Sequence, residues 1–250
     1  MFVLAAICLV FLLAGLVKGV IGMGLPTVSV GLLSLFMPPA EAAAILVIPS
    51  MVTNIWQLWA GPRFADLARR LATMMVGILL GTWFAAWLAA LSGPGLLTAE
   101  TAARATQGLG LALMVYAGLG LAKVRFSVAR EHEWWLGPLI GAVTGAITAA
   151  TGVFVIPAVP YLQAIGLARD DMIQAQGLSF TVSTVALAAT LVGDGALKGA
   201  NLSLSLVALL PALVGMHLGQ WVRLRVRPDL FRLCFLTGLL LLGAHLAIFR

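Results

Sequence analysis

The strongest chemical feature of the sequence is a single lysine beside a glycine-rich break in a long apolar run. The stretch KGVIGMGLPT spans residues 18–27, and the run that contains it has no other charge before Glu41. An isolated ammonium group is costly inside a bilayer, so such a residue commonly marks a binding site or an ion path. Glycines permit a reversed backbone, and Pro26 suits the first turn of a new helix. The pattern predicts a broken helix whose break carries positive charge.

A broken helix of this kind can bind an anion, because its second arm begins with unpaired N–H groups at the positive end of a helix dipole. Lys18 lies one helical turn before the break and adds a full charge. The alternative is that the Lys18 side chain only extends to the cytoplasmic interface. The predicted first tip consists of Gly22, Met23, Gly24, Leu25, Pro26 and Thr27. A weaker echo of the motif predicts a second tip of Thr148, Ala149, Ala150, Thr151 and Gly152.

Polar side chains also form a stripe on one face of a later apolar segment in each half of the chain. The first stripe contains Ser50, Asn54 and Gln57, and the second contains Gln176, Ser179 and Ser183. Residues at such spacing share a helix face, so the stripes are candidate walls of a substrate cavity; the alternative is hydrogen bonding between helices. The predicted substrate-binding residues are Lys18, Gly22, Met23, Gly24, Pro26, Thr27, Asn54, Gln57, Thr148, Thr151, Gly152, Gln176, Ser179 and Ser183.

Composition places these residues in a membrane protein. Hydrophobic residues make up 62% of the 250 positions and charged residues only 10%, with a mean hydropathy of +1.08. Soluble proteins average about 25% charged residues, so water cannot solvate this chain. The net charge of +6 does not indicate nucleic-acid binding, because the arginines lie in short breaks between apolar runs. The lipid bilayer is therefore the expected environment, and no nucleic-acid partner is expected.

The apolar runs outline the expected spans, since a crossing helix needs roughly 20 apolar residues. The runs cover about 1–37, 42–60, 71–91, 103–122, 134–165, 172–192, 202–222 and 231–249. The runs 1–37 and 134–165 are too long for one crossing, and both contain helix breakers. We therefore expect two hairpins. Arms of about 15 residues reach about 22 Å, less than the hydrocarbon core of about 30 Å, so the tips are expected to meet near the midplane.

The positive-inside rule supports hairpins that fold back. One set of basic residues then falls on a single face: Arg63, Arg69, Arg70, Lys123, Arg125, Arg130, Arg169, Arg223, Arg225, Arg227 and Arg232. Arg104, Lys198 and Arg250 remain on the other face, whereas eight simple crossings would divide the charges almost evenly. Each half then has odd parity, which predicts halves inverted relative to one another and both termini on the periplasmic side.

A weak internal repeat agrees with two halves, 1–126 and 127–250. GLVKG at 15–19 matches GAVTG at 141–145, and a second match places Gly81 over Gly215. The predicted fold class is an all-α polytopic membrane protein with two inverted repeats, each a broken or re-entrant helical hairpin followed by three transmembrane helices. Two repeats that each open with an interrupted segment are typical of secondary transporters.

The placement of the acidic residues bears on the mechanism of transport. All nine lie in loops or at segment ends, so a proton relay of carboxylates buried in the membrane is not expected. An inside-negative potential drives an anion outward with about 2.3 kcal/mol per charge per 100 mV. His217 is the remaining candidate for proton coupling. No nucleophile, phosphate-loop or metal motif occurs, which predicts a protein that is not an enzyme and needs no cofactor.

The motif GLVKGVIGMGLPT, its echo GAVTGAITAATGVFVIP and the two-half plan resemble the TauE/SafE sulfite exporter family, also called the 4-toluene sulfonate uptake permease family. The resemblance covers essentially the whole chain. It implies a protein of the bacterial inner membrane that moves sulfite, sulfonates or related small organic anions. The second tip departs from the glycine-rich pattern of many relatives, with Thr148 and Thr151 in place of glycines.

Three readings of function are compared. The leading one is a secondary transporter, most simply an exporter, that binds a small anionic substrate and works by alternating access around the meeting hairpin tips. One alternative is a non-transporting assembly or anchor subunit, which has no need for interrupted helices. Another is a facilitative anion channel, which would show no counterflow. Association into a homodimer is left open.

Overall fold

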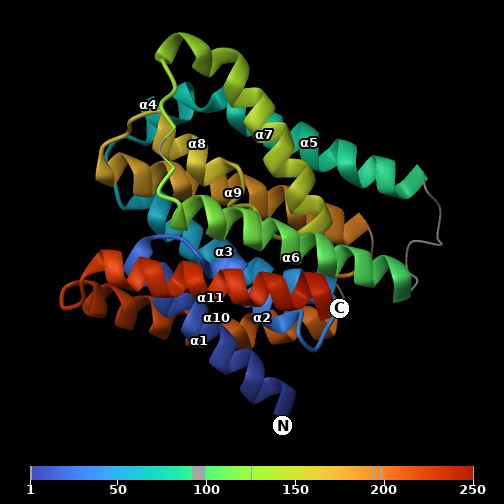
Figure 1. Ribbon diagram of the computed structural model, residues 1–250. Helices are drawn as coiled ribbons and strands as arrows, with labels where there is room; N and C mark the ends of the chain where they lie inside the picture. Colours follow the sequence, from blue (N-terminus) through green and yellow to red (C-terminus); the bar gives the residue numbers. More distant parts are fainter. Residues whose placement is uncertain (1, 92–98, 125, 194, 198, 250) are drawn as a thin grey trace.

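The computed structural model describes residues 2–91, 99–124, 126–193, 195–197 and 199–249, so Arg125, Lys198 and Arg250 lie outside the described residues. The described chain is helical (Figure 1). Its elements are α1 (Phe2–Ile21), α2 (Leu25–Leu33), α3 (Pro39–Trp59), α4 (Phe64–Arg70), α5 (Ala72–Leu91), α6 (Ala99–Leu121), the 3-10 turn η2 (Arg130–His132), α7 (Glu133–Thr151), α8 (Ala158–Ala164), α9 (Arg169–Gly193), α10 (Gly199–Arg223) and α11 (Pro228–Phe249).

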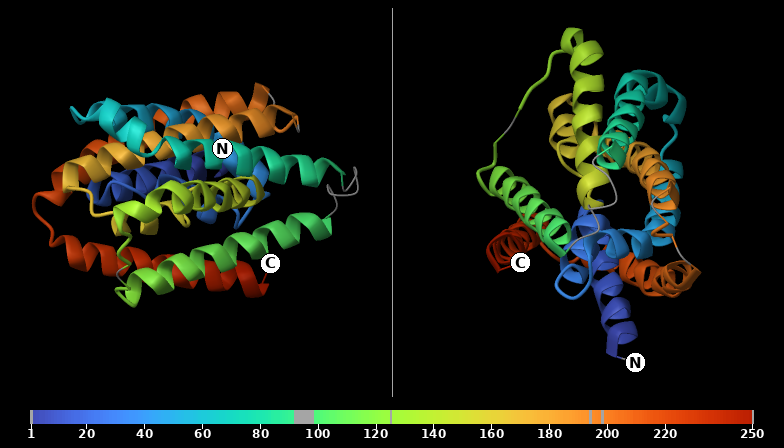
Figure 2. Two further views of the ribbon diagram at one scale, coloured as in Figure 1. Left: turned by 90° about the horizontal axis from the view of Figure 1, so that it is seen from above. Right: turned by 90° about the vertical axis from the view of Figure 1, so that its right-hand side faces the viewer.

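Six of the described helices are long and apolar enough to cross a membrane, which confirms the predicted all-α polytopic class. These spans are Val3–Ile21, Pro39–Trp59, Ala72–Leu91, Asp170–Gly193, Asn201–Arg223 and Asp229–Phe249. α6, α9, α10 and α11 run in roughly the same direction, whereas α1 and α7 are steeply inclined to them (Figure 2). The end-on view shows α6 and α11 packed as a pair at one side.

The first apolar run forms a hairpin, as predicted, but with unequal arms. α1 has 20 residues and α2 has 9. The chain reverses between them at Gly22 and Gly24, whose φ angles of 85° and 112° suit residues without a Cβ. The expected arms of about 15 residues are therefore incorrect, because the break follows a full-length helix rather than the middle of the run.

The second hairpin reverses later than the sequence predicts. α7 continues to Thr151, and the non-helical segment runs from Gly152, with φ 72°, to the start of α8 at Ala158. Thr148 and Thr151 lie within α7, and each hydroxyl donates to the carbonyl four residues earlier, at 2.7 Å. The predicted tip at 148–152 is thus about one turn early.

The two tips lie far apart, which contradicts the expectation that they meet at the midplane. The Gly22 carbonyl accepts a hydrogen bond from Gln57, whereas a Cβ on Gly152 would lie 2.7 Å from Cβ of Ala43. Ala43 and Gln57 are fourteen positions apart on α3, about 21 Å along the helix. The reason is length: α1 and α7, with 20 and 19 residues, each cover most of the hydrocarbon core.

Small residues let the first arms pack closely on helices of the other half. A Cβ added to Gly15 of α1 would lie 2.2 Å from the carbonyl oxygen of Ala212 in α10. In the same way, a Cβ on Gly81 of α5 would lie 2.0 Å from the carbonyl oxygen of Ala142 in α7. Such contacts leave no room for a side chain and bring the backbones together. α1 with α10 and α5 with α7 are therefore tightly joined pairs.

The largest buried apolar cluster surrounds the two hairpins, where Phe154 of the second tip lies 5.3 Å from Phe180 of α9 between ring centroids. α3 and α9 pack against each other in the middle of the molecule. This arrangement brings the two predicted polar stripes to one place.

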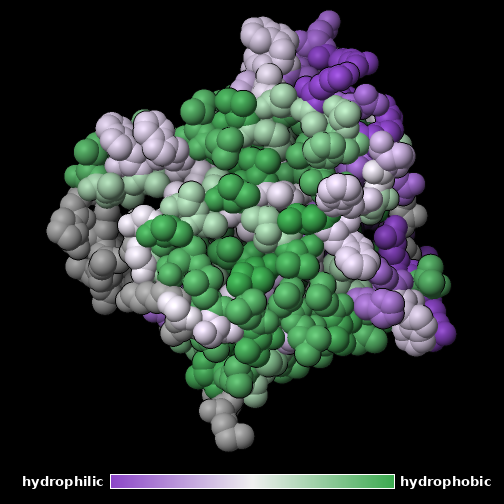
Figure 3. All heavy atoms as spheres, turned by 180° about the vertical axis from the view of Figure 1, so that it is seen from behind, coloured by the Kyte–Doolittle hydropathy of each residue, from purple (hydrophilic) through white to green (hydrophobic). Residues whose placement is uncertain are grey.

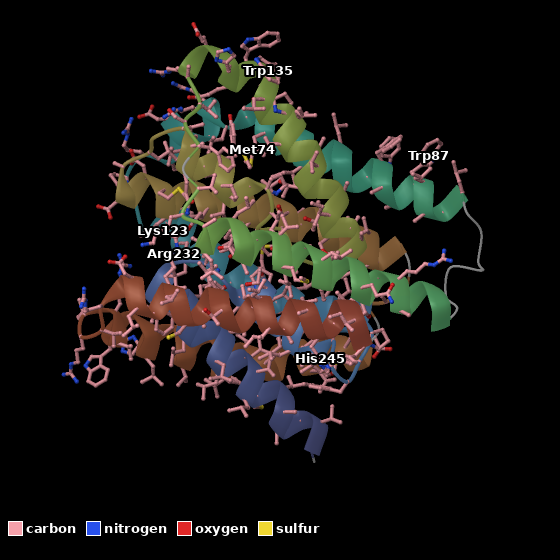
Figure 4. The ribbon with its side chains drawn as sticks, in the orientation of Figure 1. Met74, Trp87, Lys123, Trp135, Arg232 and His245 are labelled. Carbon is pink, nitrogen blue, oxygen red and sulfur yellow. The ribbon has the colours of Figure 1, made fainter. Side chains whose placement is uncertain are left out.

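Hydrophilic residues gather at one end of the molecule, at the right-hand edge of Figure 3. The turns after α3, α6, α8 and α10 all lie at this end (Figure 1). Lys123 and Arg232 are labelled there in Figure 4, whereas Trp87 lies toward the other end. We call this the basic end. In the described part of the chain, the turns that carry predicted basic residues such as Lys123 thus lie at one end of the molecule.

Gly81→Ala is expected to destabilise the protein by about 1–3 kcal/mol, because the added methyl group must force α5 and α7 apart. Thermal unfolding of the purified protein in detergent measures this. Gly108→Ala in α6 is the matched control, since a Cβ there meets nothing within 4 Å. Equal unfolding temperatures for the two variants would contradict the close helix crossing.

Candidate functional site

Lys18 is buried, with 2% of its surface exposed, and its ammonium group points at α3. Nζ donates a hydrogen bond to Oγ1 of Thr53, at 3.0 Å, and another to Oδ1 of Asn54. In this structure the Lys18 side chain therefore turns toward α3 and not toward the molecular surface. α1 carries the lysine, and these two hydrogen bonds hold its side chain against α3.

Neutral side chains of α3 and α9 hold these two acceptors in place. Asn54 Nδ2 donates to Ser50 Oγ at 3.0 Å and to Thr184 Oγ1 at 3.2 Å. The Ser50 and Thr184 hydroxyls also lie 3.2 Å apart. Thr53 donates to the Pro49 carbonyl at 2.7 Å, so its oxygen accepts from Lys18. The network fixes Asn54 with its oxygen toward the ammonium, because its amide nitrogen faces the two hydroxyls.

The first tip reaches the same place through Gln57 and Gln176. Gln57 Nε2 donates to the Gly22 carbonyl, and a Cβ on Gly22 would lie 3.6 Å from Oε1 of Gln176. Since a carbonyl can only accept, the orientation of the Gln57 amide is fixed and its Oε1 points elsewhere. Oε1 of Gln57 and Oε1 of Gln176 are buried, and neither has a hydrogen-bond partner among the described residues.

Two hydroxyls on the α9 stripe are also buried without a hydrogen-bond partner among the described residues. Ser179 and Ser183 are fully buried, and in the described part of the chain neither Oγ has a partner. Buried polar groups are nearly always hydrogen-bonded in folded proteins. Four unpaired oxygens along α3 and α9 therefore indicate a place that a polar guest or water completes. We call Lys18, Ser50, Thr53, Asn54, Gln57, Gln176 and Thr184 the lysine cluster.

The electrostatics of the lysine cluster favour an anion. Lys18 brings a formal positive charge, and the oxygens that its ammonium contacts belong to a neutral hydroxyl and a neutral amide. A buried charge held by neutral dipoles attracts an ion of opposite sign more strongly than a salt-bridged charge does. Hydroxyls can donate to the oxygens of such an ion, and the amide oxygens can accept from a proton or a water that it carries.

Several predicted residues do not join this cluster. Met23 faces α6, where its sulfur accepts from the Tyr116 hydroxyl at 2.9 Å. Thr27 Oγ1 donates to the Gly24 carbonyl at 3.0 Å and so bonds within the first turn of α2, which also contains Pro26. Thr148 and Thr151 bond to their own helix, and Gly152 lies against Ala43. The second tip is therefore separate from the lysine cluster.

Thr53 and Thr184 are cluster members that the sequence patterns missed. Each adjoins a predicted polar residue, Asn54 or Ser183, but falls outside the i, i+4, i+7 stripe. Thr53 could have been found from its position next to Asn54, because two neighbouring residues of one helix can both contact the same lysine of another helix. Ser50 belongs to the predicted stripe, and its hydroxyl accepts a hydrogen bond from Asn54.

Contacts between the two predicted halves close the basic end beyond the lysine cluster. Gln174 Nε2 donates to the carbonyls of Leu58, at 2.8 Å, and Gly61, and its Oε1 accepts from the Arg63 amide at 3.1 Å. The Arg63 guanidinium also pairs with Asp171 at 2.8 Å. These contacts tie the end of α3 to the start of α9. Within the described residues, no group of three His, Cys, Asp or Glu side chains could hold a metal ion.

Asn54→Leu is expected to destabilise the protein by about 1.5–3 kcal/mol, because it removes an acceptor from a buried ammonium. Lys18→Met is expected to lower the stability less than Asn54→Leu does. The double variant is expected to lose less than the sum of the two single losses, since the leucine destabilises mainly by leaving the Lys18 ammonium without an acceptor. A double-mutant cycle on thermal or denaturant unfolding measures the coupling. Additive effects within about 0.5 kcal/mol would show that the two groups do not interact.

In a comparison with protein families, the family model described as Sulfite exporter TauE/SafE matches residues 7–246. Neither the curated proteins nor the solved structures gave a match. The match covers nearly the whole chain, in agreement with the resemblance of the motif at 18–27. The chain belongs to the TauE/SafE sulfite exporter family and is a multi-pass membrane transporter of sulfite or related anions, not an enzyme.

Proposed function

We propose that this protein is a secondary transporter that exports sulfite, an organosulfonate or a related small anion across a bacterial inner membrane, with the lysine cluster as its substrate site. The observation that carries the proposal is the buried Lys18 ammonium, which contacts neutral oxygens of Thr53 and Asn54. Membership of the TauE/SafE family indicates the class of anion, and the lysine cluster offers a place to bind it.

The donors and acceptors around the cluster suit a small oxyanion. Lys18 has a third N–H direction beyond its two bonds, and the Ser179 and Ser183 hydroxyls are unpaired along α9. These groups can donate to sulfite or sulfonate oxygens. Gln57 Oε1 needs a donor, which a water or a protonated form of the anion provides. The substrate site thus combines one charge with several neutral groups rather than several charges.

Reciprocal packing supports two inverted repeats, 1–126 and 127–250. Gly15 of α1 meets Ala212 and Met216 in α10, and Gly141 of α7 meets Met74 and Ile78 in α5. In the proposed repeats α1 corresponds to α7, and α5 corresponds to α10. Each of the helices α1 and α7 thus packs on the equivalent helix of the other half. The contacts favour pairing Gly77 with Gly215 and Gly81 with Gly219, one turn away from the match of Gly81 with Gly215 that the sequence suggests.

Alternating access in this scheme rocks one half against the other, with the lysine cluster on their boundary. Lys18, Thr53 and Asn54 belong to the first half, whereas Thr184 and Gln176 belong to the second. The Gln174 contacts and the Arg63–Asp171 pair then hold the basic end closed. We assign the basic end to the cytoplasm by the positive-inside rule, which leaves both termini on the periplasmic side.

Inside-out vesicles that contain the protein are expected to take up radiolabelled sulfite saturably, whereas Lys18→Met is expected to lose at least 90% of this uptake. Removing the ammonium leaves the anion with neutral partners only. Lys123→Met is the matched control, because Lys123 is exposed at the basic end. Counterflow of unlabelled sulfite separates a carrier from a channel, and competing sulfonates and carboxylates rank the substrates.

Equal uptake by wild-type and Lys18→Met vesicles would remove the lysine cluster as the substrate site. No uptake above empty vesicles by the wild-type protein would remove sulfite, and larger organic anions would be tested in its place.

Gln174→Leu is expected to open the basic end, because the carbonyls of Leu58 and Gly61 lose their donor. The readout is the rate at which a membrane-impermeant maleimide labels a single cysteine at Ser179, with Cys8 and Cys234 replaced by alanine. Labelling from the cytoplasmic side is expected to be slow with Gln174 and at least severalfold faster with leucine. Thr181→Val on α9 is the control, since the Thr181 hydroxyl bonds its own helix. Unchanged labelling would contradict the gate.

A further inference from the structure

A cavity of about 730 Å³ lies at the basic end, beyond the lysine cluster and between the two predicted halves. Its charged lining residues are Arg63, Asp66, Arg69, Arg70, Arg130, Glu133 and Asp171. The rest of the wall includes Thr73 and the exposed ring of Trp134. We call this cavity the arginine basin. None of its residues belongs to the lysine cluster, and the Gln174 contacts lie between the two along α9.

The carboxylates of the basin are already paired with two of its arginines. Asp171 and Asp66 lie 2.8 and 3.6 Å from the Arg63 guanidinium. Glu133 accepts two hydrogen bonds from Arg70, at 2.6 and 2.8 Å. Among the described residues, the guanidinium groups of Arg69 and Arg130 have no ion-pair or hydrogen-bond partner. The four arginines and three carboxylates leave the basin with one net positive charge.

One of the helix ends around the basin adds to this excess. α4, α7 and α9 begin beside it, and each has an acidic residue in its first turn: Asp66, Glu133 and Asp171 respectively. These acids offset the positive ends of their own helix dipoles. α5 also begins there, with Thr73 in the wall, but has no acidic residue in its first turn.

The Arg70–Glu133 pair forms a fixed frame for the basin. Hydrogen bonding to Glu133 raises the pKa of the Arg70 guanidinium above its ordinary value, so Arg70 stays charged. Arg70 donates in addition to the Ile165 carbonyl at 3.0 Å. With Arg63 and Arg70 held by these contacts, Arg69 on α4 and Arg130 on η2 are the arginines available to a ligand.

We propose that the arginine basin is a second anion site, in which Arg69 and Arg130 bind an oxyanion of the sulfate or phosphate type. Guanidinium groups form paired hydrogen bonds with such oxyanions. The ligand is either a free ion or the phosphate headgroup of an anionic lipid, for which basic pockets between helices at a cytoplasmic surface are suited. Because Arg69 and Arg130 come from different halves, the bound anion bridges them and favours the closed basic end.

The test uses the full chain in phosphatidylcholine nanodiscs, with inorganic sulfate or phosphate as the free probe at constant ionic strength. Sulfate is expected to raise the unfolding temperature of the wild-type protein and of Lys18→Met, because a ligand that binds only the folded state stabilises it. The apparent dissociation constant for sulfate is expected to rise about tenfold for each guanidinium lost. Sulfate should therefore raise the unfolding temperature of Arg69→Gln/Arg130→Gln very little. Lys123→Gln/Arg227→Gln removes two exposed charges outside the basin and should match the wild type.

The lipid source is tested by native mass spectrometry of protein from nanodiscs that contain phosphatidylglycerol. Phosphatidylglycerol retained by the wild type and by Lys123→Gln/Arg227→Gln but lost from Arg69→Gln/Arg130→Gln would support the headgroup form, even without protection by free sulfate. Sulfate protection that is lost in Lys18→Met would place the anion in the lysine cluster and overturn the proposal. Equal binding by both double variants, or no binding of either probe to the wild type, would also overturn it.

Discussion

The arrangement of the central helices depends on the cost of burying one ammonium group. Lys18 is 2% exposed, and a charge in that position needs close acceptors. Thr53 and Asn54 meet this need only if α3 lies within reach of the lysine side chain, and Ser50 of α3 and Thr184 of α9 together orient Asn54. The lysine therefore constrains three helices from both predicted halves. Neutral partners hold the charge without cancelling it, which leaves the attraction for an anion.

Close helix crossings make that placement possible. Gly15 and Gly19 allow α1 to lie with its backbone on α10, and α7 lies on α5 through Gly141 and Gly145. Without a hydrophobic driving force between helices in lipid, such backbone proximity is a main source of association. Each first arm is thus held along its length before its tip reverses. The tips then fall near opposite ends of α3, where Gln57 and Ala43 receive them.

The sequence was sufficient for the features that depend on composition and periodicity. The membrane class, the folded-back hairpins and the polar faces of α3 and α9 follow from apolar length, from charge placement and from the 3.6-residue repeat. The ends of the hairpin arms did not follow, because α7 continues through Thr148 and Thr151, where the motif echo suggested a break. Nor did the role of Thr53 and Thr184, since only the crossing of α1, α3 and α9 reveals which face of each helix meets the lysine.

The depth of the lysine cluster has an electrical consequence for the proposed transport cycle. Asn54 lies five residues before the end of α3, about 8 Å along the helix from the basic end. An anion that enters there from the cytoplasm crosses a minor part of a core about 30 Å thick. Little of the membrane potential then acts on binding, and most of the available 2.3 kcal/mol per charge per 100 mV acts on the later passage to the other face. In the proposed cycle, Lys18 and its neutral partners therefore set the substrate affinity on the cytoplasmic side, whereas the potential sets the rate of outward movement.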